Sequence, residues 1–144
     1  MKQPPFRRTL CACDEDVANC KKQPGMLMPS DLAPIITRLQ VMGLDYREQL
    51  RASPGAVFAR ITEEGVIGIR IPTIVPATQP NGRCTFLTED DLCKIHDVAP
   101  AGCAFFDVHQ DKATADERSM WIHQAIAEDD WYARFRSRLR LRVV

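Results

Sequence analysis

Six cysteines in a chain of 144 residues are the feature that most constrains the fold. They form two groups of three separated by a long stretch without cysteine: Cys11, Cys13 and Cys20, then Cys84, Cys93 and Cys103. A disulfide framework needs an oxidising compartment and suits chains too small to bury a core. This chain is long enough to bury a core, and residues 1–10 contain no apolar run typical of a secretory signal. We therefore expect a cytosolic protein whose reduced cysteines bind a metal.

Composition narrows the classes of partner. The formal net charge is zero, so no overall field attracts nucleic acid or an anionic membrane surface. The lack of an apolar run in residues 1–10 also argues against a transmembrane segment there. We expect neither nucleic acid nor a membrane as a partner, whereas a protein partner, with this chain as an accessory subunit, is compatible with the sequence.

The periodicity of apolar residues predicts a small α+β fold, with residues 1–144 as one domain. A helix should begin at Ser30 and end before Gly43, because apolar residues recur between them at helical spacing. A second, shorter helix is expected at residues 45–52. Residues 56–71 are rich in β-branched side chains around a Glu-Glu-Gly turn, which predicts a hairpin. Residues 72–82 contain three prolines and an Asn-Gly pair, which favours an irregular connection.

The last part of the chain, about residues 114–141, should be helical. Thr114 and Glu117 have the spacing of a capping box. Asp129 or Asp130 would cap a continuation of that helix, in which Trp131, Phe135 and Leu139 form one apolar stripe. Helices around a short hairpin, with a loop-rich cysteine site joining the two ends of the chain, are the predicted architecture.

Soft thiolate ligands bind zinc and iron–sulfur clusters strongly, and four of them complete a tetrahedral zinc ion or a four-iron cluster. Six cysteines exceed one such site, so the surplus is either outside the metal shell or forms a second site through bridging thiolates. The sequence contains no Cys-x-x-Cys pair, which argues against a zinc ribbon or a thioredoxin-type motif. Which four cysteines bind, and which metal, stay open.

Three runs around the second cysteine group resemble the signature of the YkgJ-type cysteine-cluster family. They are NGRCTFL at 81–87, LCKIH at 92–96 and APAGCAFF at 99–106. Near the first group, Cys20 is followed by PGMLMPSDL at 24–32, similar to the family segment in which the last clustered cysteine leads into a helix headed by an acid. The resemblance covers about residues 11–107.

That resemblance implies a zinc- or iron-chelating domain with a structural or redox centre. Its implied ligands are drawn from the six cysteines, and one enzyme similar to the family, a flagellin lysine methylase, uses an iron–sulfur cluster. Two alternative functions follow: an iron–sulfur-dependent transferase of methyl groups or sulfur, and a redox sensor in which Cys11 and Cys13 oxidise reversibly. Signatures of phosphate-binding loops, serine hydrolases and zinc proteases are missing, so the sequence identifies no catalytic residue.

Other polar residues are interpreted as structural. His96 follows Cys93 by three residues. We expect it to be a packed, hydrogen-bonded histidine and keep it as a reserve zinc ligand. The acidic runs at 14–16 and 89–91 are expected to be solvated loops.

Overall fold

The structure, a computed structural model, describes residues 3–9, 21–22 and 24–142. The first long helix, α2 (Leu32–Val41), follows a short 3-10 turn, η1 (Pro29–Asp31). Three residues of its apolar stripe, Leu32, Ile35 and Leu39, are almost fully enclosed, whereas Met42, just beyond the end of the helix, is 37% exposed. The helical region begins at Pro29 rather than at a Ser30 cap, because the Asp31 carboxylate accepts the Met28 N–H at 2.9 Å and closes the turn one step earlier.

The segment after α2 differs from the prediction. The expected helix at 45–52 is only one turn long, α3 (Tyr46–Gln49), and the chain then extends into strand β1 (Leu50–Ser53). Strand β1 pairs antiparallel with β4 (Thr73–Pro76), so the predicted irregular connection at 72–82 contains a strand at its start. Pro72 precedes this strand and Pro76 ends it, which are positions where proline costs few ladder hydrogen bonds.

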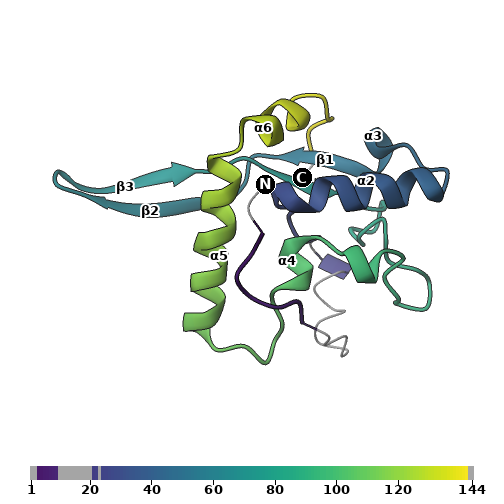
Figure 1. The fold of residues 1–144 in the computed structure, drawn as a ribbon, viewed down its shortest axis with the longest axis horizontal. Helices are drawn as coiled ribbons and strands as arrows, with labels where there is room; N and C mark the ends of the chain where they lie inside the picture. Colours follow the sequence, from purple (N-terminus) through teal and green to yellow (C-terminus); the bar gives the residue numbers. More distant parts are fainter. Residues whose placement is uncertain (1–2, 10–20, 23, 143–144) are drawn as a thin grey trace.

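The predicted hairpin is confirmed. Strands β2 (Val57–Thr62) and β3 (Gly65–Arg70) pair antiparallel from Val57↔Arg70 to Thr62↔Gly65. The hairpin forms its own two-stranded sheet and extends away from the rest of the chain, past helix α5 (Figure 1).

Two helices complete the chain, α5 (Lys112–Ala127) and α6 (Asp130–Arg136). Asp111, rather than Thr114, caps α5: its carboxylate accepts the Thr114 N–H at 2.8 Å. Asp129 caps α6 by accepting the Tyr132 N–H at 2.8 Å, which is one of the two caps expected. Phe135 and Leu139 are buried as predicted, but α6 ends at Arg136, so Leu139 lies beyond the helix. The stripe is also wrong at Trp131, which is 41% exposed, while Tyr132 is enclosed.

Tyr132 connects three parts of the core. Its hydroxyl donates to the Leu27 carbonyl at 2.7 Å and accepts the Ile74 N–H at 2.7 Å. One apolar cluster includes residues of α2, β1, β4, α5 and α6 together with Cys84, Phe86 and Ile95. The α+β class is therefore confirmed, and two cysteines of the second group, Cys84 and Cys93, pack onto the same core as the regular elements. None of the described helices is both long and apolar enough to span a membrane.

Candidate metal-binding region

Cys84 lies on a tight turn that returns the chain toward β4. The Gln79 N–H donates to the Arg83 carbonyl at 2.7 Å, and Gly82 adopts a positive φ of 86° at the bend. This geometry pairs Cys84 with Thr78 in an antiparallel bridge. The Cys84 side chain is consequently buried, with 7% of its surface exposed.

Cys93 lies at the end of a second tight loop. It pairs with Leu87 in an antiparallel bridge, and the Lys94 N–H donates to the Phe86 carbonyl at 2.8 Å. The amide of Gln79 joins the two loops, because its nitrogen donates to the carbonyls of Cys84 and Leu87, each at 3.3 Å. The backbone around Cys84 and that around Cys93 thus form one connected unit.

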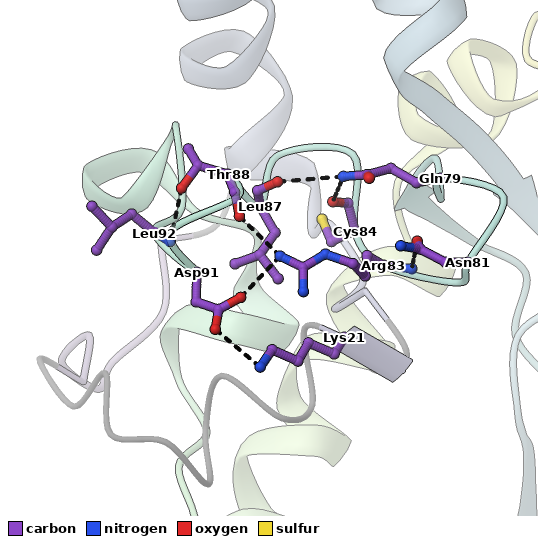
Figure 2. Close-up of polar contacts among 9 residues, drawn as sticks. All are labelled: Lys21, Gln79, Asn81, Arg83, Cys84, Leu87, Thr88, Asp91 and Leu92. Atoms are coloured by element: carbon purple, nitrogen blue, oxygen red, sulfur yellow. Dashed lines mark hydrogen bonds and ion pairs between the residues drawn. The ribbon is translucent and has the colours of Figure 1, made fainter.

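Three charged side chains fasten this unit to the segment that follows the first cysteine group. Arg83 Nη2 donates to Asp91 Oδ1 at 2.9 Å and to the Thr88 carbonyl at 2.9 Å. Lys21 Nζ lies 3.0 Å from the other oxygen, Asp91 Oδ2 (Figure 2). The hydrogen bonds from Lys21 and Arg83 lower the pKa of Asp91, so its carboxylate stays ionised well below neutral pH. We call these residues, Lys21, Arg83 and Asp91, the charged clamp.

Cys103 lies on a single helical turn, α4 (Ala101–Ala104), which packs directly on the chain after the first cysteine group. The Gly102 N–H donates to the Met26 carbonyl at 2.9 Å. A Cβ on Gly25 would lie 2.6 Å from Cys103 Sγ, and one on Gly102 would lie 2.5 Å from the Met26 nitrogen. Two glycines therefore allow the segments to touch where any side chain would hold them apart.

Asp31 fixes the start of α4. One oxygen, Oδ2, accepts both the Met28 N–H at 2.9 Å and the Ala101 N–H at 2.8 Å. Burial raises the pKa of Asp31 to about 6, although the two backbone hydrogen bonds oppose that change. Asp31 is the acid that heads the first long helix, and the sequence gives no sign that it also holds the cysteine-bearing turn, since Ala101 lies far along the chain.

The structure brings together the surroundings of the second cysteine group but does not complete a metal site there. Within residues 3–9, 21–22 and 24–142, no group of three or more histidine, cysteine, aspartate or glutamate side chains is arranged to hold a metal ion. Cys11, Cys13 and Cys20 lie outside the described residues. The described cysteines alone therefore do not make up the predicted ligand set.

Two other expectations are corrected. His96, in the 3-10 turn η2 (His96–Val98), is exposed rather than packed. The run at 89–91 is not simply a solvated loop, because Asp91 is held between two cations and adopts a positive φ of 62°. Of the three acids at 89–91, Asp91 alone has a positive φ and lies within ion-pair distance of Lys21 and Arg83. The spacing of the acids along the sequence does not reveal this difference.

Two hollows on the surface are lined by described residues other than the cysteines. A hollow of about 300 Å³ lies between the base of the hairpin and α6, beside Ile71, Ile126 and Arg136. A wider one of about 560 Å³ lies beside Arg8, Asp31 and Phe105. No described cysteine lines either hollow.

No protein-family model, curated protein or solved structure matches this chain.

Proposed function

We propose that the chain is a metal-binding protein with a cysteine-ligated zinc or iron–sulfur centre built from both cysteine groups, in a structural, redox or accessory role. The observation that carries the proposal is the charged clamp. Lys21 directly follows Cys20 in the sequence, Arg83 directly precedes Cys84, and Asp91 lies two residues before Cys93. One carboxylate thus joins the chain next to a cysteine of the first group to both loops of the second.

The contact between Gly25 and Cys103 supports the same arrangement from the other side. Gly25 lies a few residues after Cys20, and its backbone packs against Cys103 with no space for a side chain. Segments that flank four of the six cysteines therefore converge, although they are distant in sequence. The resemblance to the YkgJ-type family is consistent with such a centre, and thiolates are suitable ligands for zinc and for iron.

The number of described cysteines has a consequence for the ligands. A single zinc ion needs four ligands, and the described residues contain three of the six cysteines, Cys84, Cys93 and Cys103. A site made of cysteines alone would take at least one ligand from Cys11, Cys13 and Cys20. A zinc site of this kind would join the two cysteine groups, and loss of either group would abolish it.

The proposal is tested by elemental analysis and absorption spectroscopy on full-length protein purified without oxygen. We expect bound zinc in a colourless protein, or about four irons per chain with broad visible absorption. Iron would bring the transferase hypothesis forward, because an open position on a cluster can accept substrate. Protein that is folded, reduced and free of both metals would contradict the proposal.

The clamp is tested separately by Asp91→Asn. This change keeps the shape of the side chain but removes the charge that both cations contact, so we expect faster transfer of the metal to a chelator. Asp90→Asn is the matched control, because Asp90 is the exposed neighbouring acid. Equal transfer rates in the two variants would show that the clamp does not position the ligands.

A further inference from the structure

The β2–β3 hairpin exposes apolar side chains that nothing else in the described chain covers. Ile61 is 85% exposed, Val66 69% and Ile67 49%. At its base the hairpin is held by α5, where the Phe58 ring lies 4.3 Å from the His123 ring. Beyond that contact the strands extend away from the body (Figure 1). An isolated two-stranded sheet is marginal in water, so this one is a candidate for pairing with another chain.

Strand β3 offers an open edge of suitable composition. Among the described residues, β2 and β3 pair only with each other. From Gly65 to Ile69 strand β3 carries no charge, and exposed edges are usually protected by charges, prolines or bulges. The charges lie at its two ends, with Glu64 in the turn and Arg70 at the base. An antiparallel partner strand with the opposite charges at its two ends would match this strand.

We propose that a second copy of this chain pairs with the hairpin, β3 against β3 and antiparallel, about a two-fold axis at Ile67. In an antiparallel pair, residues directly opposite each other share a face of the sheet. With Ile67 opposite its own copy, Glu64 of each copy lies opposite Arg70 of the other. The two-fold symmetry forms this ion pair twice.

Other registers lose this complementarity. Moving the axis to Gly68 would place Arg70 opposite Val66 and leave Glu64 opposite Pro72 of the other copy. Arg70 retains donors for the pairing, because among the described residues its only side-chain hydrogen bond is from Nη1 to the Gly55 carbonyl, at 2.9 Å. The edge is six residues long, so the interface belongs to the small, reversible class and dimerisation should depend on concentration.

The test is sedimentation velocity of the protein as purified, over a wide range of concentrations. We expect a monomer–dimer equilibrium. Arg70→Glu should raise the dissociation constant about tenfold or more, because it places like charges opposite each other twice. Glu64→Arg should do the same. The matched control is Glu63→Arg, which changes the same turn by the same charge at a position opposite Ile71, and it should have a much smaller effect.

Mixing the two single variants separates a specific pairing from a folding defect. Each variant repels itself, but a mixed pair of Glu64→Arg and Arg70→Glu has opposite charges at both positions, so the mixture should associate like the unmodified protein. The double variant Glu64→Arg/Arg70→Glu should also dimerise. A chain that stays monomeric at every concentration, or a mixture that does not associate, would overturn the proposal. Ile67→Lys, which puts two lysines together at the axis, should abolish the dimer.

Discussion

The hydroxyl of Tyr132 shows how much a single buried polar group can hold. It donates to the Leu27 carbonyl and accepts the Ile74 N–H, and only 1% of the residue is exposed. Burial raises the pKa of Tyr132, so the hydroxyl stays protonated and keeps donating at neutral pH.

We predict that Tyr132→Phe lowers the free energy of unfolding by about 1–3 kcal/mol, because the Ile74 N–H and the Leu27 carbonyl lose a partner without access to water. Urea denaturation measures this. Tyr46→Phe is the control, since within the described part of the chain the Tyr46 hydroxyl has a single hydrogen bond, accepted from Arg47 at 3.3 Å near the surface. If both variants unfold at the same urea concentration, the Tyr132 hydrogen bonds are not important for stability.

The second prediction at this scale concerns Asp31 and pH. Because burial raises its pKa from 3.8 to about 6, the native state holds the proton more tightly than the unfolded chain does. This contribution to stability is fully present below about pH 3.8 and is lost as the pH rises through about 6. The amide oxygen of Asp31→Asn can still accept both backbone N–H groups but does not titrate. Relative to this variant, the free energy of unfolding of the wild type should fall by up to about 3 kcal/mol as the pH rises across that window.

Urea denaturation of both proteins on either side of the window gives the comparison. The stability difference between the wild type and Asp97→Asn should change with pH in the opposite sense. The hydrogen bond from Arg38 lowers the pKa of Asp97, so the stability that the Asp97 carboxylate contributes is lost as the pH falls. A wild-type protein that becomes more stable than Asp31→Asn as the pH rises would show that the Asp31 carboxylate is ionised without cost.

At the scale of elements, the packing of α4 depends on backbone approach. Gly102→Ala would place a Cβ 2.5 Å from the Met26 nitrogen, a backbone atom that cannot move aside without displacing the segment after the first cysteine group. We predict a loss of about 2–4 kcal/mol in the free energy of unfolding, in the range of overpacked core sites. If the proposed centre exists, its metal should also be lost faster.

Gly68→Ala is the matched control for this change. A Cβ at Gly68 meets only the end of the exposed Val57 side chain, at 3.0 Å. Its effect should be small because that side chain can rotate away. Equal melting temperatures for the two variants would mean that α4 tolerates a wider spacing than the structure shows.

At the scale of the whole molecule, metal binding and folding should be coupled. Cys84, Phe86 and Ile95 belong to the same apolar cluster as α2 and the C-terminal helices, so releasing their loops would expose core surface. If the proposed centre exists, its binding free energy is folding free energy. Removing the metal with a chelator under reducing conditions should therefore lower the melting temperature and weaken the helical circular dichroism signal. Metal-free protein that keeps both would show that the centre is not structural.

Local patterns in the sequence determine much of the secondary structure. The stripe of α2, the hairpin turn at Glu63–Glu64 and the Asp129 cap depend on near neighbours, so they follow from periodicity and turn chemistry. The helix expected at 45–52 failed beyond its first turn for the converse reason. Leu50 and Ala52 are compatible with a helix, but pairing with β4 decides their conformation.

The candidate site depends even more on distant contacts. The sequence alone determined that six cysteines are present in two groups of three. Only the tertiary structure showed that Asp91 joins Lys21 to Arg83, that Gly25 touches Cys103 and that Asp31 holds Ala101. Each of these contacts joins residues brought together by the packing of the core, and no spacing along the chain encodes which of several aspartates or glycines will meet.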